Sequence, residues 1–152
     1  MSIGDRLAAA SNRFYLRIRH PEAWRTESSA QGFDALAGHK YCLLITFRRS
    51  GEPVPTPVWF GLDDGKVYFR SEAEVGKIKR IRNEPRALVG PCNFRGRPLG
   101  PMAVGRARVL PSDGADRAEA ALQANYGLGR RLYEGSGERL GLETVYVEVA
   151  PA

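Results

Sequence analysis

Cysteine and histidine are scarce in this sequence, which contains two residues of each. Cys42 and Cys92 lie far apart in apolar stretches and belong to no C-x-x-C pair, so we expect reduced core thiols. His20 and His39 add too few ligands to make a zinc site with them, so we expect no bound metal. Neither histidine has a catalytic context, which argues against acid–base chemistry carried by the protein itself.

Long apolar runs are also missing. No stretch approaches the roughly 20 residues of a membrane helix, and residues 1–19 lack the apolar core of a signal peptide. We therefore expect a cytoplasmic protein with no membrane partner. The G-x-S-x-G, H-E-x-x-H and Walker A motifs are absent too. If the protein is an enzyme, a cofactor is expected to carry the difficult chemistry.

The composition is that of an ordinary globular protein, with 43% apolar and 26% charged residues among 152. This length suits one domain. We divide the chain into an N-terminal helical extension, residues 1–32, and a main domain, residues 33–152. In the extension, Leu7, Phe14, Leu16 and Ile18 alternate with arginines, which predicts an amphipathic helix that ends before Pro21.

Strand signals dominate the main domain. Apolar or alternating runs predict six strands at 41–47, 54–62, 66–70, 86–92, 102–110 and 144–149. Turn sequences at 49–52 and 63–65 predict that the first three strands form a meander, and Pro53, Pro55 and Pro57 restrict the second strand to a sheet edge or a ligand-facing position. Further helices are predicted at 33–37, 113–126 and 128–134. The expected fold is mainly β, a small antiparallel barrel with flanking helices.

The stretch after the third predicted strand carries the clearest binding signal. Ser71 and Glu74 match the S-x-x-E capping box and predict a helix that ends at 83–85. Lys77 and Arg80 lie on one face of its first turns. A helix N-terminus offers free N–H groups to an anion, so a hydroxyl, amides and two cations can together hold a phosphate. The alternative is that Ser71 only caps the helix and the cations are solvated.

The net charge of +6 is concentrated in one segment. Residues 75–108 contain nine basic residues and one acidic residue, a net charge of +8, so the rest of the chain is net −2. Concentrated positive charge implies an anionic partner, which can be a nucleic acid, a phosphorylated cofactor or an acidic substrate. Only Phe94 supplies a stacking aromatic among the nine cations, and no DNA-binding motif is present, so we expect no nucleic-acid partner.

Four ordered motifs resemble a known family. They are T-P-V-W-F from residue 56, Y-F-R-S from residue 68, K-x-K-R-I-R-N-x-P from residue 77 and C-x-x-R-G-R from residue 92. This series is similar to the split β-barrel flavin and deazaflavin oxidoreductases, which are relatives of pyridoxamine 5′-phosphate oxidase. The resemblance covers residues 33–150 and is closest to the actinobacterial branch that uses the deazaflavin coenzyme F420.

The resemblance implies a homodimer of FMN-binding-type split β-barrels with the cofactor in a groove at the subunit interface. It places one group of residues beside the cofactor ring and a second group at its anionic tail. The ring group is Thr56, Pro57 and Val58; the tail group is Arg70, Ser71, Lys77 and Arg80; Arg95 and Arg97 are candidates for an acidic tail or the substrate.

Two departures bear on the choice of cofactor. Pyridoxamine phosphate oxidases carry an arginine and a lysine on the second strand, where this sequence has Thr56 and Gly61. Their S-R-K segment corresponds here to residues 75–77, and of it only Lys77 remains. A flavin phosphate would lose much of its charge-assisted binding, which favours the deazaflavin branch.

The predicted function is that of an F420-dependent oxidoreductase that transfers a hydride from the reduced coenzyme to an unsaturated small molecule. No catalytic acid is assigned to the chain. Two alternatives remain open: an FMN-binding oxidase or reductase of the same barrel, and a non-catalytic F420-binding carrier protein.

Overall fold

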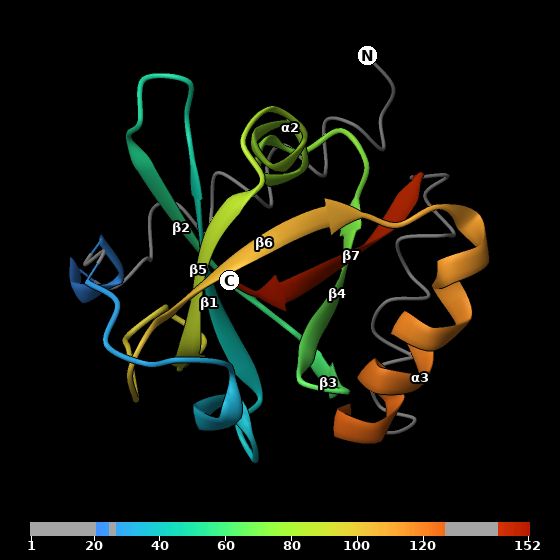
Figure 1. The fold of residues 1–152 in the computed structure, drawn as a ribbon, viewed down its shortest axis with the longest axis horizontal. Helices are drawn as coiled ribbons and strands as arrows, with labels where there is room; N and C mark the ends of the chain where they lie inside the picture. Colours follow the sequence, from blue (N-terminus) through green and yellow to red (C-terminus); the bar gives the residue numbers. More distant parts are fainter. Residues whose placement is uncertain (1–20, 25–26, 127–142) are drawn as a thin grey trace.

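A curled antiparallel sheet forms the body of the computed structural model, which describes residues 21–24, 27–126 and 143–152 (Figure 1). Its seven strands are β1 (Tyr41–Phe47), β2 (Pro53–Val58), β3 (Gly61–Asp63), β4 (Lys66–Glu72), β5 (Arg86–Cys92), β6 (Ala103–Val109) and β7 (Thr144–Pro151). The described residues also form helices α2 (Gly76–Asn83) and α3 (Ala115–Tyr126), and the 3-10 turns η1 (Pro21–Trp24), η2 (Asp34–Leu36) and η3 (Ser112–Gly114). The predicted mainly β fold is confirmed. The helices predicted before Pro21 and at 128–134 lie outside the described residues.

The strand order is β2-β1-β5-β6-β7-β4-β3, and every pair is antiparallel. The two edge strands, β2 and β3, are therefore consecutive in the chain and are separated only by Trp59 and Phe60. The sheet must curl to bring its edges together, which gives the expected split barrel. The predicted single strand over 54–62 is wrong, because it divides at this point.

The predicted meander forms only in part: both predicted turns join antiparallel pairs, β1 with β2 and β3 with β4, but the division of the second strand puts these pairs at opposite edges of the sheet. β4 pairs with β3 and β7 and does not pair with β2. The prolines explain why β2 ends the sheet: Pro55 and Pro57 face Ile45 and Leu43 of β1 and have no N–H to offer a second neighbour. The expected edge position of this strand is confirmed.

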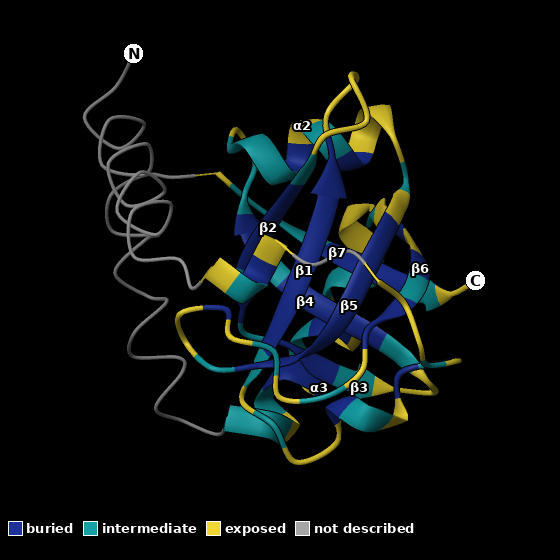
Figure 2. Cartoon of the chain, turned by 90° about the vertical axis from the view of Figure 1, so that its left-hand side faces the viewer, coloured by how far each residue is buried: buried dark blue, intermediate teal, exposed yellow. Residues whose placement is uncertain are grey.

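The inside of the curl is an apolar core. Strand residues Val67, Phe69, Val89 and Val147 all pack into it and are at most 1% exposed. α2 covers one end of the barrel (Figure 2), and its Ile78 packs into the core. The outer face of β1 and β5 is buried as well, and both strands are almost entirely dark blue in Figure 2.

The C-terminal turn of α3 provides hydrogen-bond partners for the backbone of Phe60, which lies between the edge strands β2 and β3. Phe60 is 1% exposed, and its N–H and C=O have no ladder partner between β2 and β3. Its N–H donates to the Tyr126 hydroxyl at 2.9 Å, and its carbonyl accepts from Asn125 Nδ2 at 2.9 Å. Trp59 stacks on the Tyr126 ring with centroids 5.0 Å apart. We call Asn125 and Tyr126 the α3 clasp.

A glycine allows this contact. A Cβ on Gly61 would lie 2.2 Å from the backbone carbonyl carbon and oxygen of Ala121, a distance that no real side chain tolerates. The backbone of α3 therefore rests directly on β3, and its last turn reaches Phe60. Because this position carries no side chain, it cannot supply a cation.

The cysteines behave as the sequence indicates. Cys42 and Cys92 are unbridged and are 0% and 2% exposed. Burial raises the pKa of Cys92 to about 12 and raises that of Cys42 well above its usual value, so both thiols stay protonated at neutral pH. The prediction of free core thiols is confirmed. No helix among the described residues is long and apolar enough to cross a membrane.

The clasp makes a prediction about stability. Replacing Asn125 by Ala leaves the buried Phe60 carbonyl without its side-chain donor, which is expected to lower the free energy of unfolding by about 1–3 kcal/mol. Urea denaturation measures this change. Gln123→Ala, in the same turn of α3, is the matched control and should cost less than about 0.5 kcal/mol. Equal losses for the two variants would contradict the clasp.

Candidate functional site

The predicted anion site lies where β4 ends and α2 begins, but it is built differently from the sequence prediction. Ser71 belongs to β4, is 4% exposed, and its Oγ donates to the carbonyl of Glu72 at 3.0 Å. α2 starts at Gly76 with Val75 as its N-cap, so the predicted capping box is wrong. The reason is tertiary: Ser71 and Glu72 pair with β7, and ladder hydrogen bonds hold them in the strand.

The start of α2 nevertheless presents an open N-terminus. Val75 supplies no side-chain hydrogen bond to the first turn. Its carbonyl accepts from the N–H groups of Ile78 and Lys79, at 3.2 and 3.4 Å. The N–H groups of Gly76 and Lys77 precede these and have no intrahelical acceptor. They lie at the positive end of the helix dipole, which favours an anion there.

Lys77 adds a cation at this end of the helix. The residue is half-buried, and burial lowers the pKa of its ammonium group. The carboxylate of Glu72 opposes this shift, and the charge of Arg80 adds to it. Within the described part of the chain, no hydrogen bond or ion pair joins the Lys77 ammonium to another residue. A bound anion would offset the cost of holding this charge.

Arg80 ties the first turn of α2 to the sheet. Its Nε donates to Thr46 Oγ1 at 2.7 Å, and Thr46 is 1% exposed on β1. The guanidinium folds back over Gly76, since a Cβ added to Gly76 would lie 2.7 Å from Arg80 Nη1. Thr46 is a site residue that the sequence did not predict. The available signal was a threonine within an otherwise apolar strand, which needs a polar partner when buried.

The three candidate ring residues on β2 do not share one face. Val58 packs into the inner core, and Thr56 has the same orientation and is 8% exposed. Thr56 lies opposite Leu44, and Thr46, two residues further along β1, is its diagonal neighbour on the same face. This face therefore continues toward Arg80. Pro57 is half-buried on the opposite face.

Arg70 likewise lies apart from Ser71. Successive strand residues alternate in direction, and Phe69 and Ser71 point inward. Arg70 therefore points outward, where its Nη2 donates to Thr144 Oγ1 of β7 at 3.2 Å. The structure thus gathers Ser71, Lys77 and Arg80 around the start of α2 and places Arg70 on the other side of the sheet.

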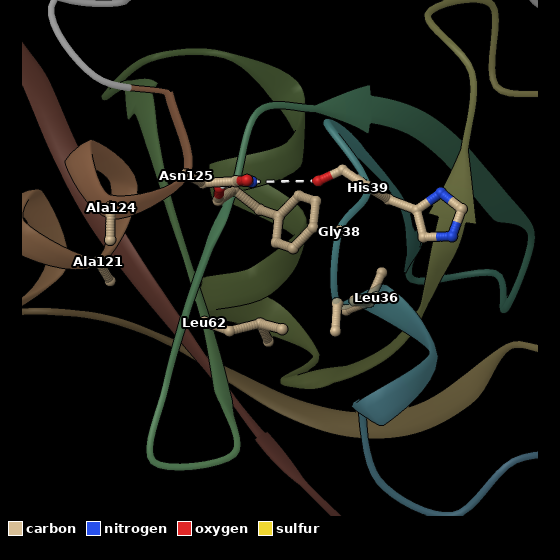
Figure 3. A pocket seen from close by; sticks show the side chains of 9 residues that line it. Leu36, Gly38, His39, Leu62, Ala121, Ala124 and Asn125 are labelled. Atoms are coloured by element: carbon tan, nitrogen blue, oxygen red, sulfur yellow. Dashed lines mark hydrogen bonds between the residues drawn. The ribbon is translucent and has the colours of Figure 1, made fainter.

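Two pockets in the described part of the chain lie elsewhere. One, of about 250 Å³, lies beside the α3 clasp between η2, β3 and α3, where Leu36, Leu62 and Ala121 form its apolar walls and Asn125 Nδ2 donates to the His39 carbonyl at 3.2 Å (Figure 3). The other, of about 350 Å³, lies between the β1–β2 turn and the end of α2. Neither includes any of the seven predicted cofactor residues. Among the described residues, no group of three or more His, Cys, Asp or Glu could hold a metal ion.

Comparisons with known proteins agree with this fold. The family model described as pyridoxamine 5′-phosphate oxidase matches residues 30–149. A FAD-binding protein from Mesorhizobium loti is 18% identical with a TM-score of 0.56, covering 77% of this chain and 82% of its own. The heme storage protein HutZ from Vibrio cholerae is 10% identical with a TM-score of 0.57, covering 76% and 83%.

A solved F420 reductase is 18% identical with a TM-score of 0.51, covering 82% of this chain and 96% of its own. No curated protein matches the sequence. At these identities the likeness to the solved structures shows the fold alone.

The environment of Lys77 predicts an unusual substitution effect. Lys77→Met removes a desolvated charge. Without ligand at neutral pH, the free energy of unfolding of this variant is therefore expected to exceed that of the wild type by roughly 0.5–2 kcal/mol. The folded pKa is lowered, so the wild type bears this cost only while Lys77 is protonated. The difference in stability between Lys77→Met and the wild type therefore shrinks as the pH rises through that lowered pKa toward the ordinary pKa of lysine.

Thermal denaturation over a range of pH values tests this effect. Lys79→Met, one residue further along α2 and exposed, is the control and should leave stability unchanged. A Lys77→Met variant no more stable than Lys79→Met at neutral pH would contradict the assignment.

Proposed function

The chain belongs to the pyridoxamine 5′-phosphate oxidase family, and within that family we propose that it is an oxidoreductase dependent on the deazaflavin coenzyme F420. The observation that carries the proposal is the arrangement at the start of α2. It combines the N–H groups of Gly76 and Lys77, the half-buried Lys77 ammonium and the Arg80 guanidinium over Gly76. These groups suit the anionic tail of such a coenzyme.

Two positions on β2 and β3 argue against flavin phosphate. The second-strand lysine of pyridoxamine phosphate oxidases corresponds to Gly61, which contacts the α3 backbone and has no space for a side chain. The second-strand arginine corresponds to Thr56, which carries no charge. A doubly charged phosphate would find fewer cations here than in those oxidases, which supports the deazaflavin over FMN.

The bound, reduced deazaflavin would supply a hydride to an unsaturated small-molecule substrate. In this proposal Thr56 and Val58 lie on β2 beside the cofactor ring. Ser71, Lys77 and Arg80 hold the tail and fix the position of the ring against the substrate. The exposed Arg95 and Arg97 are candidates for the acidic end of the tail or for the substrate. The proton that completes the reduction comes from solvent.

We also propose that two copies of the chain complete the groove. Pro57 and Arg70 point away from the face that carries Thr56 and Ser71, so one cofactor cannot touch both sets on a single barrel. At an interface, one copy can present its outer face to the cofactor held by the other. The unbridged buried cysteines fit the cytoplasmic location that we propose.

A binding titration tests the choice of cofactor. Oxidised F420, FMN and haem are titrated separately against the protein and followed by absorbance and fluorescence. We expect F420 to bind at least about tenfold more tightly than FMN, a difference of about 1.4 kcal/mol. Micromolar binding of FMN or haem without binding of F420 would sink the proposal.

Lys77→Ala tests the residue assignment in the same titration. Loss of a charged hydrogen bond is expected to weaken F420 binding by about 1.5–3 kcal/mol. Lys79→Ala, a neighbouring lysine outside the proposed site, should bind as the wild type does. An unchanged dissociation constant for Lys77→Ala would remove Lys77 from the site.

Turnover separates an enzyme from a carrier. Reduced F420 is mixed with catalytic amounts of the protein and with enone, quinone or tetrapyrrole acceptors, and oxidation of the coenzyme is recorded. Oxidation with at least one acceptor, above the rate without protein, is the expected result. Tight binding without oxidation by any acceptor class would favour the non-catalytic F420-binding carrier.

A further inference from the structure

The pocket between the β1–β2 turn and the end of α2 is rich in arginine. Its volume is about 350 Å³. We call it the arginine pocket; its lining residues are Phe47, Arg48, Arg49, Gly51, Asn83, Glu84 and Arg86. Three cations and one carboxylate give the lining a net charge of +2. It lies at the opposite end of α2 from Lys77, which is six residues, or about 9 Å, along the helix axis from Asn83.

Among the described residues, no carboxylate forms an ion pair with the Arg86 guanidinium of this pocket. The Arg86 guanidinium lies 4.7 Å from the centroid of the Phe47 ring, a cation–π contact. Glu84 accepts a hydrogen bond at 3.0 Å from the backbone N–H of Arg86. The Phe47 ring thus positions the Arg86 guanidinium by contact with its flat face. The N–H groups, which lie in the plane of the guanidinium, remain available to bind an anion.

A second arginine lies directly across the sheet. Arg86 of β5 pairs with Arg106 of β6. The N–H of Ala107 donates to the carbonyl of Pro85 at 2.8 Å, which makes the arginines a non-hydrogen-bonded pair, the position where opposing side chains come closest. Like charges at such a position repel.

In the part of the chain that the structure describes, no acid pairs with Arg106 to offset this repulsion. Two residues along the same face, Arg108 Nε donates to Glu148 Oε1 at 3.0 Å. Within the described part of the chain, no hydrogen bond or ion pair joins the side chain of Arg106 to another residue. On this face Arg108 is neutralised by Glu148, whereas Arg86 and Arg106 form a like-charge pair. A bound anion would neutralise that pair.

We propose that the arginine pocket, together with Arg106, binds the phosphate group of a small phosphorylated molecule, at a site separate from the start of α2. Guanidinium forks match phosphate oxygens in bidentate geometry, and a concave site of this volume suits a small ligand better than a long polyanion. The proposal does not depend on the identity of the cofactor.

The test is calorimetric titration of the full chain with inorganic pyrophosphate at constant ionic strength. We expect a dissociation constant below about 1 mM. Arg106→Gln is expected to weaken binding by about tenfold or more. It should also raise the melting temperature of the ligand-free protein, because it removes the repulsion with Arg86. Lys79→Gln removes an exposed charge that lies outside both proposed sites; it is the control and should change neither quantity.

A charge-conserving variant separates specific recognition from general attraction. Arg86→Lys keeps the charge but removes the guanidinium fork, so pyrophosphate affinity should fall by about fivefold or more. Four results would overturn the proposal: no binding to the wild type, equal losses for Lys79→Gln and Arg106→Gln, competition between pyrophosphate and F420 or FMN, and tighter binding of a short DNA duplex than of pyrophosphate.

Discussion

The two edges of the sheet, β2 and β3, are joined by only two residues, and most of the molecule follows from that connection. A seven-stranded sheet whose edges are consecutive in the chain has to curl. The curl places the apolar faces of β1, β4, β5 and β7 around one core. It also leaves the backbone of Phe60 without ladder partners in a buried position, and unpaired buried backbone groups are costly. The α3 clasp satisfies both groups, which explains why this helix packs where it does.

The same curl arranges the candidate site. Thr46, Thr56 and Ser71 point inward because their strands alternate around the core, and α2 covers the end of the barrel near them. Arg80 reaches from α2 to Thr46 and fixes the helix against β1. The open N-terminus of α2 is thereby held on a rigid support beside Lys77. An anion bound there would be positioned by backbone and packing, with little reorganisation of the chain.

The sequence predicts the parts of this fold that depend on local pattern. Strands β1 and β5 match the predicted ranges 41–47 and 86–92, because each is an apolar run bounded by turn or loop residues. The failures involve residues distant in sequence. The Ser71 capping box is locally sound, but pairing with β7, more than 70 residues away, holds Ser71 in a strand.

The contacts of the α3 clasp and of Thr46 could not be predicted from the sequence for the same reason. Asn125 and Tyr126 meet Phe60 from 65 and 66 residues away, and no periodicity within α3 marks them. Arg80 was placed correctly on α2, whereas its partner Thr46 lies 34 residues upstream. Hydrogen bonds that close a barrel depend on topology, and a single sequence carries little information about them.

The central claim is that the start of α2 holds the anionic tail of the cofactor. Amide chemical-shift mapping of the ¹⁵N-labelled protein, with increasing amounts of F420, tests it most directly. The account predicts that the largest shifts occur at Gly76 and Lys77, whose N–H groups face the proposed anion. Shifts concentrated around Phe60 and Asn125, or around Arg86 and Arg106, with Gly76 and Lys77 unchanged, would contradict it.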